Sequence, residues 1–251
     1  MTHARFTPVQ VRSRRVVGLC AFAVVLLSGS TAYGLGLGGH HLTPPSVPAI
    51  TEFGSRRNLE ITAAGIAATW FATAHEDAGK MQLKLENTPG EGGSDIGNVY
   101  GDGLVLGAGT AALWTFGHFT DDPYAMGTAS DMALSLVISG AVTTALKVAI
   151  HRTRPNGGPY SFPSGHTSGA FAVAPILAAR YGWKAGVPAY TLALMTGLGR
   201  MEDRKHFASD VLAGATVGLV VGRTVADHRR GMLLQEHLYV SGRGLGVQFQ
   251  F

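Results

Sequence analysis

Three clusters of polar residues stand among otherwise apolar, glycine-rich segments in the second half of the chain. They are Lys147 with Arg154-Pro155, then Pro163-Ser164-Gly165-His166, and then Arg200 with His206 and Asp210. A guanidinium group donates forked hydrogen bonds to phosphate oxygens, while an ammonium group supplies a point charge. Three cations, two histidines and one carboxylate therefore predict a pocket for a compact polyanion, and phosphate is the obvious candidate.

The first cluster is expected at the end of a helix over residues 129–152. Lys147 and Arg154 are seven residues apart, close to two helical turns, so both side chains are expected on one side of it. Pro155 is expected to end the helix. His151 and Arg152 lie between the two cations, and we expect them to support the binding groups or to contact solvent.

The second cluster is expected to open the next helix, because it follows Pro163 and precedes an apolar run. Ser164 is a candidate N-cap, and the free N–H groups at a helix start bind anions. Gly165 would let a phosphate approach the backbone. A purely structural cap explains this short motif equally well when it is considered alone.

The third cluster places His206 and Asp210 four residues apart, a spacing that brings two side chains together on one helix face. The carboxylate would fix the tautomer of the ring and leave the other nitrogen as a nucleophile. The alternative is a carboxylate that complements the helix dipole beside an ordinary histidine.

These motifs, taken in order, resemble the signature of the type 2 phosphatidic acid phosphatase superfamily, which includes bacterial non-specific acid phosphatases and vanadium haloperoxidases. The shared pattern is lysine, six residues and Arg-Pro, then Pro-Ser-Gly-His, then arginine, five residues, histidine, three residues and aspartate. The resemblance covers about residues 129–222. Gly199 departs from it, since the family usually has serine before this arginine, and the missing hydroxyl puts one secondary contact in doubt.

The resemblance implies that His206 attacks phosphorus and forms a phosphohistidine, with Asp210 orienting it. His166 would protonate the leaving oxygen and later activate water. The phosphate-binding groups would be Lys147, Arg154, Ser164, Gly165 and Arg200. It further implies that the cations stand in for a metal, so no metal and no cofactor are expected.

The function that the resemblance implies is a metal-independent phosphatase acting on phosphate monoesters, either a lipid phosphate or diphosphate or a soluble acid-phosphatase substrate. Two alternatives stay open: a vanadate-dependent haloperoxidase, and a non-catalytic protein that binds phosphate or lipid. Retention of both histidines and of Asp210 argues against the latter, because binding alone needs only the cations. Nucleic acid is not expected as a partner, since four of the 20 basic residues lie before residue 33 and the remaining 16 balance 16 acidic ones.

The segments that must position these clusters are helical in pattern, so the predicted fold class is all-α, a six-helix bundle of the phosphatidic acid phosphatase and haloperoxidase type. With 251 residues, 46% of them hydrophobic and 14% charged, the chain has material for one core. The expected helices cover residues 59–75, 100–118, 129–152, 165–181, 185–201 and 207–227. Residues 86–98 are expected to form a polar, glycine-rich loop.

Whether these helices cross a bilayer is a matter of length, because a spanning helix needs about 20 apolar residues. The longest run between charges or histidines has 15 residues, from Met132 to Leu146 and from Ala185 to Gly199, which favours a soluble bundle. None of the six segments has a well-charged outer face, which favours the membrane-embedded or peripheral alternative.

The two ends of the chain differ in character from the bundle. Residues 1–32 have the layout of a signal peptide, which predicts a periplasmic or secreted location, with a membrane anchor as the alternative. Residues 33–58 are expected to form an extended arm, and residues 59–230 the catalytic domain. Residues 231–251 end in alternating apolar and polar residues and are expected to form a short β-hairpin.

Overall fold

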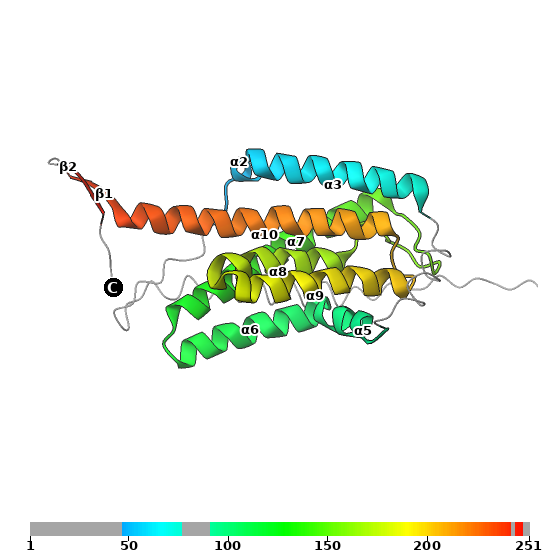
Figure 1. Ribbon diagram of the computed structural model, residues 1–251, viewed down its shortest axis with the longest axis horizontal. Helices are drawn as coiled ribbons and strands as arrows, with labels where there is room; N and C mark the ends of the chain where they lie inside the picture. The colour runs from blue at the N-terminus through cyan, green and yellow to red at the C-terminus, as the bar shows by residue number, and fades with distance from the viewer. Residues whose placement is uncertain (1–46, 77–90, 242–243, 248–251) are drawn as a thin grey trace, which may run out of the picture. The chain divides into compact units, whose positions relative to one another are not determined.

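The computed structural model describes residues 47–76, 91–241 and 244–247. Eight helices and two strands lie in these ranges (Figure 1). The elements are α2 (Ile50–Phe53), α3 (Arg56–His75), α5 (Glu91–Tyr100), α6 (Gly103–Phe119), α7 (Pro123–Ile150), α8 (Gly165–Tyr181), α9 (Trp183–Glu202), α10 (Ala208–His237), β1 (Leu238–Ser241) and β2 (Gly244–Val247). The all-α prediction is confirmed for the bundle, whereas the count of six helices is wrong.

Helix α5 lies where a loop was expected, and its glycines explain the difference. A Cβ atom on Gly97 would lie 2.3 Å from the backbone carbon of Met195, and one on Gly101 would lie 2.1 Å from Cγ2 of Thr196. Glycine lowers helix propensity, but here it lets α5 pack directly on α9. Tertiary contact, which local composition does not report, therefore stabilises this helix.

The predicted terminal segments lie only partly within the described residues. The predicted signal peptide, residues 33–46 of the predicted arm and residues 86–90 of the predicted loop lie outside the described residues. Within the remainder of the arm, α2 and the first turn of α3 are helical. Helix α10 continues past residue 230 to His237, and after it β1 and β2 pair antiparallel with Ser241 opposite Gly244.

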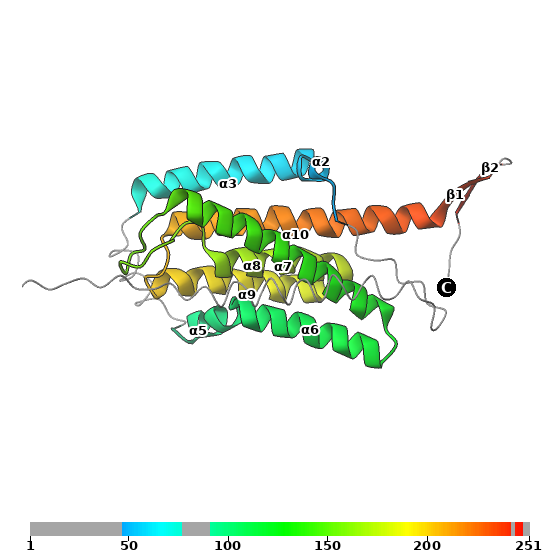
Figure 2. The same cartoon turned by 180° about the vertical axis from the view of Figure 1, so that it is seen from behind.

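All the functional clusters lie at one end of the bundle, because successive long helices run in alternating directions (Figures 1 and 2). Helices α3, α7 and α9 end there, and α6, α8 and α10 begin there. Helix α8 packs against α7, α9 and α10, so it forms the centre of the bundle.

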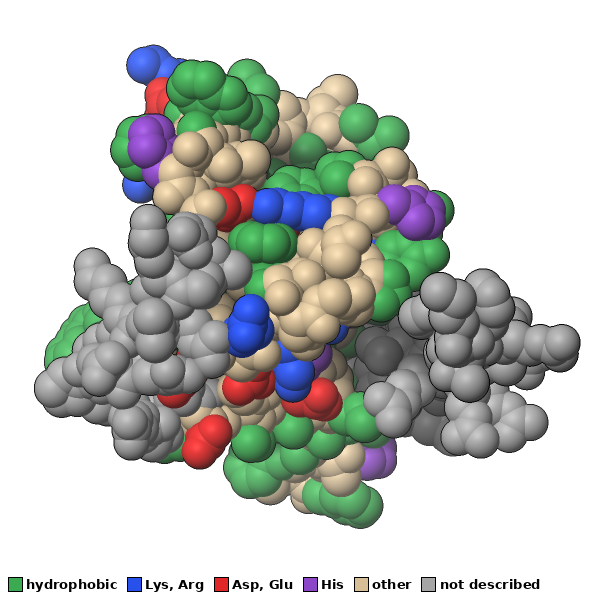
Figure 3. Space-filling view, turned by 90° about the vertical axis from the view of Figure 1, so that its right-hand side faces the viewer, with side chains coloured by type: hydrophobic (Ala, Val, Ile, Leu, Met, Phe, Trp, Pro, Cys, Tyr) green, Lys and Arg blue, Asp and Glu red, His purple; other side chains and the backbone are tan. Residues whose placement is uncertain are grey.

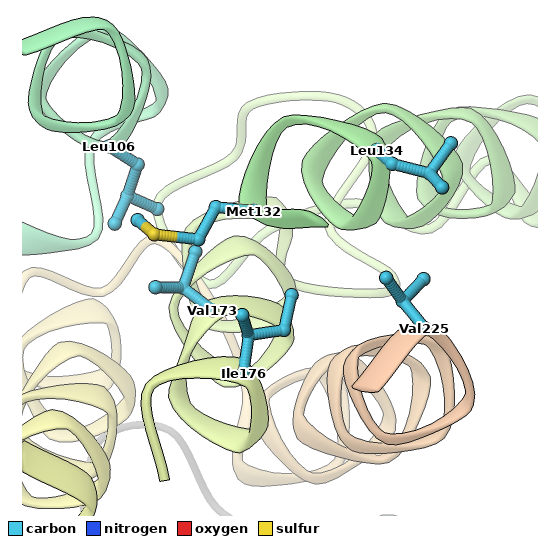
Figure 4. Close-up of a cluster of buried hydrophobic side chains, with 6 residues drawn as sticks. All are labelled: Leu106, Met132, Leu134, Val173, Ile176 and Val225. Carbon is cyan, nitrogen blue, oxygen red and sulfur yellow. The ribbon is translucent and has the colours of Figure 1, made fainter. Parts of the chain in front are cut away.

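The apolar core lies between α6, α7, α8 and α10. Leu106, Met132 and Val173 lie together with Ile176 next to them, while Val225 points from α10 toward α7, the helix that carries Leu134 (Figure 4). Polar residues accompany this core along the α7–α8 interface: Ser139 Oγ lies 2.5 Å from Ser168 Oγ. Such hydroxyls take the place of large apolar side chains and let the two helices approach closely.

Three glycines of α10 determine how that helix meets α8. A Cβ atom on Gly214, Gly218 or Gly222 would lie 2.5, 2.3 or 2.2 Å from a backbone carbonyl oxygen of α8, and side chains essentially never approach that closely. The glycines recur every four residues, which places them on one face of the helix. Helix α10 therefore lies directly on the α8 backbone.

The outer surface of the bundle is largely apolar. Trp70 on α3 is 75% exposed and Phe119 on α6 is 80% exposed. Further large exposed hydrophobic residues are Leu59, Ile66, Phe71, Leu104, Phe116, Val142, Val148, Trp183, Val187, Leu194 and Leu198. Among the described residues, the helical stretches Pro123–Ile150 and Ala208–Arg230 are long and apolar enough to cross a membrane by length and composition.

Helix α7 is longer and more apolar than the run from Met132 to Leu146 indicates, because that run is bounded by the charged residues Asp131 and Lys147. Asp131 is buried and accepts hydrogen bonds from Arg180, at 2.6 Å, and from Arg229, at 3.1 Å. Lys147 donates to the carbonyl of Tyr160 at 2.7 Å. Charges with partners inside the protein do not prevent the outer face of a helix from being apolar.

The close packing of α10 on α8 gives a testable consequence. We expect Gly218→Ala to destabilise the fold by about 1–3 kcal/mol, because the added methyl group forces the two backbones apart. Gly140→Ala is the matched control: it also lies inside a helix, but a Cβ atom there meets nothing within 4 Å. The control should gain about 0.5–1 kcal/mol from helix propensity. Thermal unfolding in detergent compares the two, and equal midpoints would contradict the packing argument.

Candidate active site

The second and third clusters are joined through the backbone. Ser164 caps α8, and its side chain accepts a hydrogen bond from the N–H of Thr167. The backbone N–H of Ser164 donates to the carbonyl of Asp210, in the first turn of α10, at 2.9 Å. The start of α8 therefore lies beside the start of α10, and Gly165 and His166 lie next to the turn of α10 that carries Asp210.

The first cluster reaches the same place by a different route from the one expected. Helix α7 ends at Ile150, and His151 adopts a left-handed conformation with φ of 50°. Arg154 therefore lies in the following loop, where its N–H donates to Gly158 at 2.7 Å, and the expectation that it continues the helix face of Lys147 is wrong. A non-glycine residue in this conformation redirects the chain at the helix end.

Two of the three cations carry buried donors without a partner. The Nε groups of Arg154 and Arg200 are buried and have no hydrogen-bond acceptor among the described residues. Arg200 is 6% exposed, and its Nη1 donates to Asn98 of α5 at 3.1 Å. Lys147 differs, since its ammonium group is bound by carbonyl oxygens of the loop. Unpaired buried donors on guanidinium groups are what an anion site offers before its ligand binds.

His206 and Asp210 are both buried, with exposed fractions of 4% and 0%. Nδ1 of the histidine lies 3.7 Å from Oδ2 of the aspartate and has no hydrogen-bond partner in the described part of the chain. That distance exceeds a hydrogen bond, and such contacts in ligand-free sites commonly shorten when the substrate binds. His206 precedes α10 rather than lying within it, so the turn before the helix brings the two groups together.

The two histidines have pKa values below the usual range. Burial lowers the pKa of His206, the Asp210 carboxylate acts in the opposite direction, and the positive charges of Lys147 and Arg154 lower it further. Burial and then the charge of Arg200 lower the pKa of His166 to about 4. Both shifts favour the neutral ring near pH 7, which is the form in which an imidazole can act as a nucleophile.

The structure adds five polar residues that the motifs do not mark as site residues: Glu76, Asn98, Asp102, Arg152 and Ser161. Asp102 caps α6 by accepting a hydrogen bond from the N–H of Leu104, and its Oδ2 lies 3.6 Å from Nε2 of His166. Ser161 donates to Asp210, and Arg152 lies 2.9 Å from the same carboxylate. Arg152, expected to support the binding groups or to contact solvent, instead contacts the carboxylate of Asp210. Figure 3 shows basic and acidic side chains gathered on this end of the bundle.

Sequence and structure comparisons identify the family of this region. Residues 128–229 match the PAP2 superfamily, so the resemblance seen in the motifs is confirmed for this region. Lipid A 1-phosphatase of Porphyromonas gingivalis is 43% identical over 94 residues, which are 36% of this chain and 21% of that protein. Undecaprenyl-diphosphatase BcrC of Bacillus subtilis is 28% identical over 118 residues, 44% of this chain and 61% of that protein.

The aligned parts thus span less than two thirds of each of these curated relatives. The crystal structure of LpxE from Aquifex aeolicus superimposes with a TM-score of 0.50 and 21% sequence identity, over 59% of this chain and 92% of that one. At this identity, the likeness establishes a shared fold.

The position of Asp102 predicts the titration of His166. The carboxylate raises the pKa of His166, against the larger lowering by burial and Arg200. Asp102→Asn keeps the helix cap, since asparagine caps as well as aspartate, but removes the charge. We expect the His166 ring of the variant to stay neutral at pH 4, where the wild-type ring is about half protonated, as measured by NMR of labelled histidine rings.

Asp122→Asn provides the matched control, because Asp122 caps α7 in the same way at the other end of α6. It should leave the titration of His166 unchanged. Identical titration curves for Asp102→Asn and wild type would show that the carboxylate has no effect on this ring.

Proposed function

We propose that the chain is a phosphatase that hydrolyses the phosphate ester or diphosphate of a lipid through a phosphohistidine on His206. The observation that carries the proposal is the pair of buried, unpaired guanidinium donors, on Arg154 and Arg200, beside a buried histidine–aspartate pair. A site with this set of groups can bind a phosphoryl group and offer it a neutral imidazole.

In the proposed first step, Nε2 of His206 attacks phosphorus, and the bond from phosphorus to the leaving oxygen breaks. The new N–P bond leaves the imidazole positively charged, and the Asp210 carboxylate beside Nδ1 stabilises that charge. His166 donates a proton to the leaving oxygen. Because the anionic substrate raises the pKa of a nearby histidine, binding supplies the protonated form of His166 that this step needs.

In the second step, His166 accepts a proton from water, whose oxygen attacks phosphorus, and the N–P bond breaks to release phosphate and free His206. The charge on the equatorial oxygens in both steps is compensated by Lys147, Arg154 and Arg200, aided by Ser164 and the backbone N–H of Gly165. Fixed cations and backbone donors stabilise such a transition state without reorganisation.

A lipid substrate agrees with the surroundings of the site. The bundle sides are apolar, as shown by Trp70 and Phe119, and two helices have the length and composition to cross a membrane. The relatives include a lipid A 1-phosphatase and an undecaprenyl-diphosphatase. We therefore propose a membrane-anchored enzyme, whose phosphate site lies at the end of the bundle where a headgroup would enter, on the periplasmic side that the leader at residues 1–32 would specify.

The nucleophile assignment predicts that His206→Ala abolishes phosphate release. The expected loss in kcat is about a thousandfold or more, because no other group can form the covalent intermediate. The assay measures phosphate released from phosphatidate, phosphatidylglycerophosphate, isoprenyl diphosphates and p-nitrophenyl phosphate, which also ranks the substrate classes. His118→Ala, an exposed histidine at the end of α6, is the matched control and should retain full activity. Undiminished release by His206→Ala would refute the mechanism.

The location is tested by fractionation. We expect the protein to remain with membranes after washing at high salt and alkaline pH and to be extracted by detergent, because its apolar outer surface remains in contact with lipid. Release into the supernatant by either wash would contradict the membrane proposal and leave the phosphatase proposal standing.

A further inference from the structure

Glu76 is a buried carboxylate that belongs to none of the three motifs and lies outside the PAP2 match. It follows the last residue of α3, and its side chain is 7% exposed. Oε2 accepts a hydrogen bond from the N–H of Ser209 at 3.2 Å, and Oε1 accepts one from the Ser209 hydroxyl at 3.0 Å. A buried carboxylate is costly unless it is paired, and the partner of this one is Arg152.

Arg152 connects Glu76 to the reacting pair. Its Nη2 donates to Oε1 of Glu76, while its Nη1 donates to Oδ1 of Asp210 at 2.9 Å and to Ser209 at 2.6 Å. The guanidinium also lies over the ring of Phe207, 4.1 Å from its centre. The planar guanidinium is thus held between two carboxylates and has little freedom to rotate.

The two carboxylate oxygens of Asp210 have different hydrogen-bond partners. Oδ1 accepts from Arg152, whereas Oδ2 accepts from the N–H of Phe207 at 2.9 Å and from Ser161 and faces Nδ1 of His206. Rotation of the carboxylate would break the bond to Arg152. The guanidinium therefore fixes the orientation of the carboxylate plane that the histidine faces.

Glu76 also balances the charge of Arg152. Without it, the full charge of Arg152 would be opposed by Asp210 alone. With Glu76 present, the Arg152 charge is shared between two carboxylates, so Asp210 keeps negative charge for the imidazolium of His206. Arg152 is consequently separated in function from the three cations of the phosphate site.

We propose that Glu76 and Arg152 are positioning residues of the His206–Asp210 pair, which makes the end of α3 part of the catalytic unit; this inference rests on the proposed phosphatase function. The two residues touch Asp210 rather than the phosphoryl group. Their loss should therefore impair the chemical step and leave phosphate binding intact.

The test separates kcat from binding of inorganic phosphate. We expect Arg152→Gln and Glu76→Gln each to lower kcat by about tenfold to a hundredfold, since misplacement of a nucleophile by about 1 Å has effects of this size. In both variants the inhibition constant of phosphate should change by no more than about twofold. Arg200→Gln removes one of the proposed phosphate-binding groups, so it should raise that constant by about tenfold or more. The double variant should lose about as much kcat as either single one, because the residues act as one unit.

Arg180→Gln is the matched control, because Arg180 forms a comparable buried ion pair with Asp131 away from the site. It should leave kcat unchanged, even where thermal stability falls. Should Arg152→Gln fail to fold, the nearly isosteric Glu76→Gln and the small change Ser209→Ala decide the matter by the same measurements.

Three results would overturn the inference: unchanged kcat in Glu76→Gln, a raised phosphate inhibition constant in Arg152→Gln, or a loss in Arg180→Gln equal to that in Arg152→Gln. The failure of the proposed function is distinguishable from these. In that case the wild-type protein releases no phosphate from any substrate tested, or His206→Ala releases it at the wild-type rate.

Discussion

The direct contact between α8 and α10 is the constraint on which the site depends. Gly214, Gly218 and Gly222 bring the α10 backbone against carbonyl groups of α8. One helical turn before Gly214, the carbonyl of Asp210 accepts the hydrogen bond of Ser164. A larger residue at any of these glycines would separate α10, which carries Asp210, from the start of α8 at Ser164. The glycines therefore set the distance between the two motifs, although they touch neither substrate nor nucleophile.

The charges of the site show how burial and pairing act together. Burial lowers the pKa of both histidines, while three cations lie close by. A site that gathers positive charge and leaves guanidinium donors without acceptors is unfavourable when empty and is stabilised by an anion. The carboxylates are arranged differently: Glu76 and Asp210 are both satisfied by Arg152 and by Ser209 or Ser161. The guanidinium donors thus suit an anion such as a phosphoryl group, and the Asp210 carboxylate is held in place beside His206.

The motifs predict candidate site residues at helix ends, where local signals are strong. Ser164 before an apolar run predicts a cap, and the structure has that cap. The turn at His151, by contrast, has no local signal that separates it from continued helix, so the spacing predicts Lys147 and Arg154 on one side of a helix although Arg154 lies in the loop that follows. Arg152 and Glu76 are 76 residues apart in sequence, and no spacing rule relates them. Contacts of that kind follow from packing of α3 on α10, which only the fold reveals.

Polar groups lie inside the bundle together with its apolar core, and large apolar residues lie on its outside. Its interior holds hydroxyls such as Ser135 and Ser139 and the ion pairs of Asp131, whereas Trp70 and Phe119 lie outside. In water, burial of large apolar residues drives helices together, so they belong inside. In lipid that driving force is absent, and close packing of small residues with internal hydrogen bonds takes its place. Close packing of glycines and serines, with charges paired inside the protein, is therefore compatible with an apolar outer surface. A count of apolar run lengths does not detect this in α7, because it stops at charges such as Asp131 that have partners in the interior.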